Sequence, residues 1–279
     1  MLLRLPRNRQ LSLDKCKLMA ILNVTPDSFS DGGKFVGHDA ALRQVEQMLK
    51  DGADIIDIGG ESTRPGAAEV SITEELNRVI PVIELIRREF DTVISIDTYK
   101  AAVMKAAIEA GADIINDVRA LQDEGAIEVA VKTQVPVCLM HMRGMPGSMQ
   151  QLAYYQQVTA EVLSFLLERA NVCIKAGIAP GQIILDPGFG FAKTLAHNYR
   201  LLAELGQFQQ SGYAVLAGMS RKSMIGQLLN RPVSERLAGS IACATIAVMH
   251  GARIIRAHDV RETADAIAVA EATMSGELE

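Results

Sequence analysis

A chain of 279 residues, 49% of them hydrophobic, with a formal net charge of −5, is long enough to form one large α/β domain. The mild negative charge argues against a general surface for nucleic acid or for anionic membranes. Residues 1–13 lack the apolar stretch of a signal peptide, and no later run reaches the ~20 apolar residues of a membrane span. We therefore expect a cytoplasmic protein that acts on small molecules.

Nothing resembling a linker or a low-complexity stretch divides the chain. We predict a single domain over residues 1–279, in which residues 1–15 form an N-terminal extension before the first barrel strand. The cysteines have neither the paired spacing of a zinc site nor the density of a disulfide-bonded secreted domain. We expect reduced core thiols at all four positions, Cys16, Cys138, Cys173 and Cys243.

Apolar runs bounded by turn residues predict strands that alternate with helical patterns along the whole chain. The strands are expected at 18–22, 55–58, 93–96, 114–116, 135–140, 183–185, 214–217 and 253–256. The helices are expected at 40–50, 73–89, 99–109, 125–132, 151–176, 195–205, 234–250 and 260–274, of which 151–176 is the longest. This alternation predicts parallel strands joined by right-handed crossovers.

One phrase recurs in the chain, as Gly-Ala-Asp-Ile-Ile at 52–56 and 111–115 and as Gly-Ala-Arg-Ile-Ile at 251–255. A glycine that ends a helix, followed by a short β-branched strand, is one helix-to-strand unit. Eight such units predict an α/β fold of the (β/α)8 TIM-barrel type. A doubly wound open sheet is the alternative, but the glycine-rich nucleotide-binding loops typical of that sheet are missing from the sequence.

Each predicted strand is followed by polar residues, which a barrel would gather at one face. A single strand-end Asp is more often a helix cap or a turn residue. A mixture of carboxylates, amides, cations and imidazoles after every strand instead indicates a binding mouth. These residues are Asn23, Asp57 with Glu61, Asp97, Asn116 with Asp117, His141, Asp186, Ser220 with Arg221 and Lys222, and Arg256 with His258.

The chemistry of these residues narrows the class of ligand. Asp97, Asp186 and Asn116 suit a flat heterocycle with adjacent N–H donors, such as an aminopyrimidinone edge. Arg256 and His258 are a plausible clamp for an anion, with a surface ion pair as the alternative. The polar, glycine-bearing loops at 23–33 and 59–66 are expected to act as lids over this face, although such loops are often only solvated turns.

These segments resemble the dihydropteroate synthase family, whose members are pterin-binding barrels. The resemblance rests on motifs that occur in family order between residues 19 and 260. The motifs are MAILNVTPDSFSDGG at 19–33, DIGGESTRPG at 57–66, SIDT at 95–98, IND at 115–117, MHM at 140–142, LDPGFGF at 185–191, SRKS at 220–223 and RAHDV at 256–260.

The resemblance implies a homodimer, a sulfonamide target, and an SN1-like, Mg²⁺-assisted condensation of 6-hydroxymethyl-7,8-dihydropterin pyrophosphate with p-aminobenzoate. It places the pterin on Asp97, Asn116, Met140, Asp186, Phe191, Gly218 and Lys222, of which Asp97, Asp186 and Lys222 are catalytic. It places the pyrophosphate on Asn23, Thr63, Arg256 and His258, with Asn23 also on the metal. It places p-aminobenzoate among Phe29, Thr63, Arg64, Pro65, Phe191 and Ser220.

Several of these residues have ordinary alternatives. Met140 and Phe191 could be core side chains, and Lys222 could pair with an aspartate for stability. The chain could also be a pterin-binding barrel that transfers a methyl group from methyltetrahydrofolate, or a pterin-binding protein without catalysis. The absence of a nucleophilic triad does not count against the synthase, because an aromatic amine can attack a cation without a strong base. The apolar segment 241–249 is a candidate dimer face.

Overall fold

The computed structural model describes residues 1–24, 33–61, 69–144 and 149–276. Eight parallel strands close into a barrel in the order β10, β3, β4, β5, β6, β7, β8 and β9. Closure is made by β10 and β3, where Arg256 pairs with Met19 in the strand register. The strands are β3 (Lys17–Asn23), β4 (Ile55–Gly59), β5 (Val93–Asp97), β6 (Ile114–Asp117), β7 (Val137–Met140), β8 (Ile183–Asp186), β9 (Ala214–Ala217) and β10 (Ile254–Ala257). The predicted TIM barrel is confirmed, and the open sheet is excluded.

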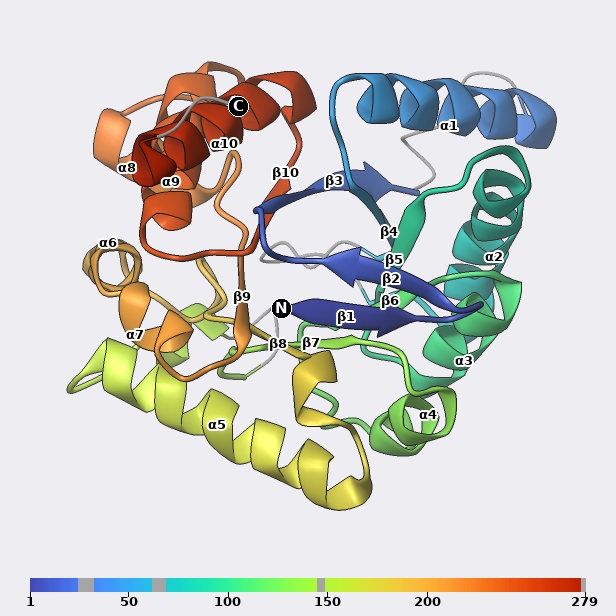
Figure 1. The fold of residues 1–279 in the computed structure, drawn as a ribbon, viewed down its shortest axis with the longest axis horizontal. Coiled ribbons are helices and arrows are strands. Elements are labelled where there is room, and N and C mark those ends of the chain that lie inside the picture. Colours follow the sequence, from blue (N-terminus) through green and yellow to red (C-terminus); the bar gives the residue numbers. More distant parts are fainter. Residues whose placement is uncertain (25–32, 62–68, 145–148, 277–279) are drawn as a thin grey trace.

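Helices surround the barrel, as Figure 1 shows. They bury one face against the strands and leave the other to solvent, so the strands are apolar on both faces. The helices are α1 (Gly33–Lys50), α2 (Ile72–Glu89), α3 (Ala101–Ala110), α4 (Ala126–Thr133), α5 (Val158–Ala176), α6 (Leu195–Ala203), α7 (Gly206–Gln209), α8 (Ser223–Leu229), α9 (Leu237–Met249) and α10 (Val260–Ser275). None of those described is long and apolar enough to cross a bilayer.

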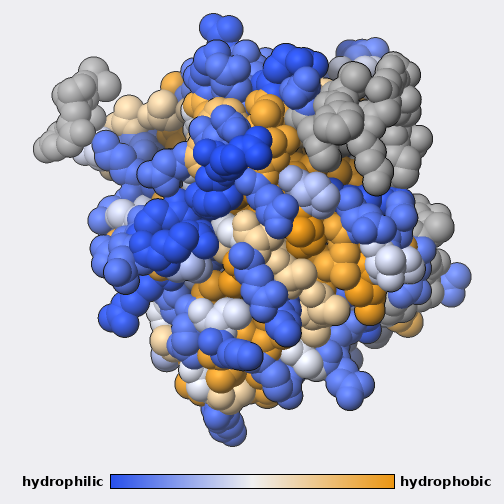
Figure 2. Space-filling model, turned by 90° about the vertical axis from the view of Figure 1, so that its right-hand side faces the viewer, coloured by the Kyte–Doolittle hydropathy of each residue, from blue (hydrophilic) through white to orange (hydrophobic). Residues whose placement is uncertain are grey.

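Figure 2 shows the flank that carries α1, α2 and α3, where hydrophilic side chains surround hydrophobic ones. Exposed apolar residues such as Ile72 on α2 are common on protein surfaces and do not by themselves mark an interface. The four cysteines, by contrast, are all buried and free, in agreement with the expected core thiols.

The recurring Gly-Ala phrase forms the joint between helix and strand, as predicted. At Gly111, φ is 125°, a conformation that residues with a side chain rarely adopt, and its N–H donates to the carbonyl of Ala107 at the end of α3. A Cβ at Gly111 would lie 2.9 Å from Cγ of Arg87, so this close approach also requires glycine. The chain then turns directly into β6.

Several helical predictions differ from the structure. The helix expected at 40–50 begins earlier, at Gly33, and the helix expected at 234–250 begins later, at Leu237. The helix expected at 151–176 begins at Val158, because the N–H groups of Gln156 and Gln157 donate to the carboxylate of Glu161 and Tyr155 turns inward. The helix expected at 195–205 ends at Ala203 and is followed by the short α7, and α8 was not predicted. Strand ends differ by only one or two residues.

The N-terminal extension is an antiparallel hairpin of β1 (Leu2–Leu5) and β2 (Arg9–Ser12), which the sequence did not predict. Figure 1 shows it lying across the end of the barrel that faces the viewer. Four leucine side chains of this extension are buried in one apolar cluster with residues from the starts of the barrel strands. They are Leu3, Leu5, Leu11 and Leu13. The hairpin therefore closes the amino-terminal end of the barrel.

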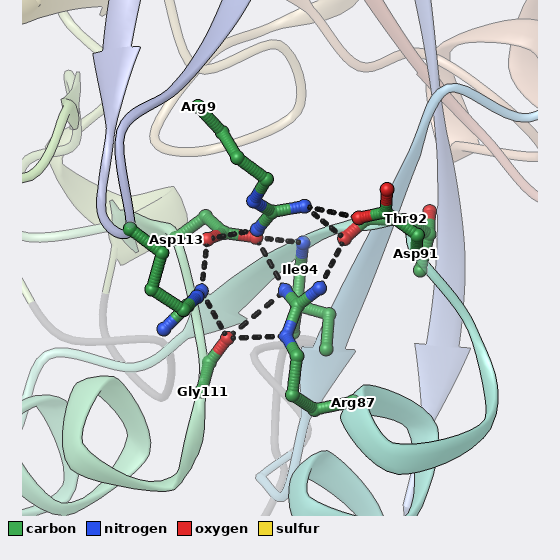
Figure 3. Close-up of polar contacts among 8 residues, drawn as sticks. Arg9, Arg87, Asp91, Thr92, Ile94, Gly111 and Asp113 are labelled. Carbon is green, nitrogen blue, oxygen red and sulfur yellow. Dashed lines mark hydrogen bonds and ion pairs between the residues drawn. The ribbon is translucent and has the colours of Figure 1, made fainter.

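A buried carboxylate fixes this hairpin to the barrel (Figure 3). Asp113, fully buried just before β6, pairs with Arg7 and Arg9 of the hairpin region and, at 2.6 Å, with Nη2 of Arg87 on α2. Its Oδ2 also accepts the N–H of Ile94 at 3.0 Å. One carboxylate thus joins the hairpin, a helix and two strands.

We expect Asp113→Asn to lower the free energy of unfolding by about 2–3 kcal/mol, because three guanidinium groups would lose their shared anion. Urea unfolding measures the change. Asp91→Asn is the matched control, since Asp91 also pairs with Arg9 but its side chain is 89% exposed. A loss as large in the control would contradict the role assigned to Asp113.

Candidate active site at the carboxyl ends of the strands

The barrel gathers the predicted polar residues at the carboxyl ends of its strands. Asp97 and Asn116 pair directly in the register of β5 and β6, and Met140 pairs with Asp186 in that of β7 and β8. Asp57, on β4, is fully buried, and Asn116 and Asp186 are 4% and 6% exposed. Buried polar groups of this kind need partners, either within the protein or in a ligand.

Arg256 lies between two of these carboxylates. Its Nε donates to Oδ2 of Asp57 at 2.6 Å, and its Nη2 donates to Oδ2 of Asp97 at 2.7 Å. The amide of Asn116 donates to the same Asp57 oxygen at 3.2 Å. Burial and the two carboxylates act on Arg256 in opposite directions, and the carboxylates raise its pKa above the usual value. The ion pairs thereby join β10, β4 and β5, and the hydrogen bond of Asn116 adds β6 to this network.

Two oxygens of this network lack a hydrogen-bond partner among the described residues. They are Oδ1 of Asp57 and Oδ1 of Asp97. Burial raises the pKa of Asp97 to about 7, opposed by Arg256 and reinforced by Asp57. An unsatisfied buried carboxylate oxygen is a strong acceptor that a ligand N–H can satisfy.

Asp57 is among the polar residues expected at the strand ends, but the sequence predicts no binding role for it. In the structure it positions both Arg256 and Asn116. Its place directly after the recurring Gly-Ala phrase, equivalent to that of Asn116, was the sequence signal that could have identified it.

A second polar group surrounds Asp186. Its Oδ1 accepts the N–H of Gly188 at 2.7 Å, and Nζ of Lys222 donates to the carbonyl of Phe189 at 2.6 Å. Burial raises the pKa of Asp186, whereas the Lys222 charge opposes that rise. Burial also lowers the pKa of Lys222 to about 8, opposed by Asp186. Among the described residues Lys222 forms no ion pair with an aspartate, and its contact with a ligand stays a prediction.

Met140 and Phe191 belong to a small apolar cluster that is separate from the two main cores. Nζ of Lys222 lies 4.9 Å from the centre of the Phe191 ring, a cation–π contact. An apolar wall beside Asp186 and Lys222 is what a flat heterocycle requires, and the contact of Met140 and Phe191 with a ligand stays a prediction.

The remaining predicted residues form the rim. Oγ of Ser220 accepts the N–H of His258 at 3.1 Å and lies 3.2 Å from its Nδ1, and Gly218 lies beside Arg256. Asn23 is exposed at the end of β3. The structure therefore places Arg256 among the carboxylates and His258 against Ser220, instead of a surface ion pair.

Four of the predicted residues lie outside the described part of the chain. They are Phe29, Thr63, Arg64 and Pro65. The two predicted lids fall largely in the same segments. Their assigned contacts with p-aminobenzoate and pyrophosphate stay predictions.

Comparison with known proteins agrees with this site. The model of the family described as "Pterin binding enzyme" matches residues 19–258. Dihydropteroate synthase of Haemophilus influenzae is 56% identical over 266 residues, which cover 95% of this chain and 97% of that protein.

Two solved structures extend the agreement to three dimensions. Yersinia pestis dihydropteroate synthase, determined with a sulfonamide drug, is 54% identical with a TM-score of 0.93 and covers 99% of this chain and 100% of that one. Xanthomonas albilineans dihydropteroate synthase with 4-aminobenzoic acid is 46% identical with a TM-score of 0.92 and covers 98% of each chain. The chain belongs to the dihydropteroate synthase family of pterin-binding enzymes.

Proposed function

We propose that this chain condenses 6-hydroxymethyl-7,8-dihydropterin pyrophosphate with p-aminobenzoate to give 7,8-dihydropteroate and pyrophosphate, the reaction of its family. The observation that carries the proposal is the group of buried carboxylates at the strand ends, in which Oδ1 of Asp97 has no partner among the described residues. A pterin supplies the N–H donors that such acceptors need.

The pterin is bound by Asp97, Asn116, Asp186 and Lys222. Asp97 and Asp186 accept its N–H groups, Asn116 both donates and accepts, and Lys222 donates. Met140 and Phe191 flank the ring through apolar contact. This arrangement is supported by the burial of the polar groups, which strengthens each hydrogen bond relative to one in water.

The reaction separates charge, and the mouth has groups of both signs to stabilise it. When the C–O bond breaks, its electron pair leaves with pyrophosphate, and positive charge spreads from the methylene into the pterin ring. Asp97 and Asp186 stabilise that cation, while Arg256 and His258 stabilise the leaving anion. The amine of p-aminobenzoate then forms the new N–C bond and releases a proton to pyrophosphate or solvent.

The described residues fit a Mg²⁺ ion that arrives with the substrate better than one that is permanently bound. They contain no group of three or more His, Cys, Asp or Glu side chains able to hold a metal. Asn23 offers one exposed amide oxygen, and Mg²⁺ typically combines few protein ligands with phosphate oxygens and water. When bound there, the ion neutralises charge on the departing pyrophosphate.

We also propose that the chain acts in the cytoplasm as a homodimer that uses α8, α9 and α10. Large apolar side chains on these helices are exposed. They are Leu228, Leu229, Leu237, Ile246, Met249 and Val269, of which Val269 is 63% exposed. Exposed apolar side chains on neighbouring helices favour a protein partner, and a second copy offers the same surface.

The function is tested by measuring pyrophosphate release and dihydropteroate formation together, with and without p-aminobenzoate. We expect equal amounts of both products. Asp97→Asn keeps the shape of the side chain but removes its charge, so we expect kcat/KM to fall about 100-fold. Pterin binding without either product would instead support the non-catalytic or methyl-transfer alternatives, and full activity in Asp97→Asn would contradict the role of this carboxylate.

The pH dependence of kcat/KM for the pterin substrate reports the free enzyme. Asp97, with a pKa of about 7, loses its charge as the pH falls, and Lys222, with a pKa of about 8, loses its charge as the pH rises. We therefore expect kcat/KM to follow a narrow bell-shaped pH profile with its maximum between these two pKa values. Asp97→Asn should remove the fall of kcat/KM at low pH. If that fall persists, it belongs to another group, such as Asp117, whose pKa is also raised by burial to about 7.

Light scattering in solution tests the dimer. We expect twice the chain mass for the wild type and the mass of one chain for Ile246→Asp, because a buried charge at the interface is costly. Val172→Asp on α5 is the matched control, since Val172 and Ile246 are 42% and 40% exposed. A monomeric wild type, or equal dissociation of both variants, would contradict the proposed face.

A further inference from the structure

Lys193 is a buried lysine to which the proposed reaction assigns no role. It is 4% exposed and lies just after the turn that connects β8 with α6. Its Nζ contacts the carbonyls of Gly188 and Phe191, both at 2.9 Å, Nδ1 of His141 at 3.0 Å, and the carbonyl of His141 at 3.4 Å. Within the described part of the chain it forms no ion pair with a carboxylate, although the charge of Asp186 raises its pKa against the effect of burial. Lysine is rarely buried in this way, so its polar contacts need an explanation.

Three of these contacts are short and match the donating capacity of the amine, and the fourth, to the carbonyl of His141, is longer at 3.4 Å. An ammonium group donates three hydrogen bonds, and here two carbonyls and an imidazole nitrogen accept them. Burial lowers the pKa of His141 to about 2, so its ring is neutral and can accept. Burial also lowers the pKa of Lys193 well below its usual value. A neutral amine would keep the same three short contacts, because it could accept a hydrogen bond from the imidazole N–H in place of donating one.

The turn that Lys193 holds is unusual in its backbone. Gly188, Gly190 and Ala192 have positive φ values of 71°, 84° and 49°. Ala192 has a side chain and is therefore strained in this conformation. A Cβ at Gly188 would lie 2.0 Å from the carbonyl oxygen of His141, so the turn is pressed against the end of β7. External hydrogen bonds are needed to hold such a backbone in one arrangement.

The same turn supplies contacts to the site. The N–H of Gly188 orients Asp186, and the carbonyl of Phe189 accepts from Lys222. The ring of Phe191 lies beneath the Lys222 ammonium. The carbonyls of this turn are thus divided between two lysines, with Lys193 behind the turn and Lys222 at the pterin site.

We propose that Lys193 is a positioning residue that acts through the turn at 188–191 and sets where Asp186, Lys222 and Phe191 meet the pterin. The inference rests on the proposed function for the identity of the ligand. Lys193 does not touch the substrate. Its loss should therefore weaken pterin binding, while a smaller effect is expected on turnover at saturation.

The test compares Lys193→Met with wild type. Methionine has a similar length but cannot donate to the carbonyls. We expect the Kd for 6-hydroxymethyl-7,8-dihydropterin pyrophosphate, measured by calorimetry, and its KM to rise about tenfold, with kcat changed less than about twofold. Because calorimetry needs no turnover, failure of the wild type to release pyrophosphate would refute the proposed function separately from this inference.

Arg87→Met is the matched control. Arg87 also donates to backbone carbonyls, those of Gly111 and Thr92 (Figure 3), but beside the hairpin at the amino-terminal end of the barrel. We expect it to lower stability without changing pterin affinity. Equal weakening in both variants, or an unchanged Kd in Lys193→Met, would overturn the inference.

A second variant keeps the test decisive if Lys193→Met does not fold. His141→Phe removes the imidazole acceptor and leaves Lys193 with its three backbone carbonyls. We expect a Kd increase of about threefold in this variant, in the same direction as for Lys193→Met. An unchanged Kd in a folded His141→Phe would overturn the inference.

Discussion

The ionic network of Arg256 with Asp57 and Asp97 is the constraint on which the site depends. Two carboxylates buried close together repel each other strongly, and the guanidinium between them makes their burial possible. The three residues come from β10, β4 and β5, so they meet only because β10 pairs with β3 and closes the barrel. In an open sheet β10 would be separated from β4. The pairing of β10 with β3 that closes the barrel therefore also brings Arg256 to the two carboxylates.

The amino-terminal end of the barrel contributes to stability, whereas the carboxyl end carries the candidate active site. At the amino-terminal end, Asp113 and its arginines satisfy one another and fix the hairpin. At the carboxyl end, Asp57 and Asp97 each keep an oxygen without a partner in the described residues. A well-packed core and an amino-terminal end closed by the hairpin can stabilise the fold while carboxylate oxygens at the carboxyl end lack hydrogen-bond partners until a ligand binds. The positive φ values at 188–192 belong to that same functional end.

Much of this structure could be predicted from sequence, for reasons that differ among its parts. The strands were placed within one or two residues, because strands buried on both faces are continuous apolar runs. The hairpin was missed, since two short strands give little periodic signal. Lys193 and His141 could not be paired in advance, because nothing local distinguishes a buried lysine from an exposed one. Asp57 was recognisable as a strand-end residue, but its partners depend on contacts distant in sequence.

The central claim is that this mouth, in an enzyme of the dihydropteroate synthase family, stabilises a pterin cation formed before the amine attacks. The kinetic isotope effect of deuterium at the methylene that bears pyrophosphate tests this claim most directly. If the C–O bond breaks first, the methylene carbon becomes planar in the transition state, and the account predicts a clear normal effect on kcat/KM. An effect near unity would show that the amine attacks while the bond breaks, and it would contradict the role given to Asp97 and Asp186.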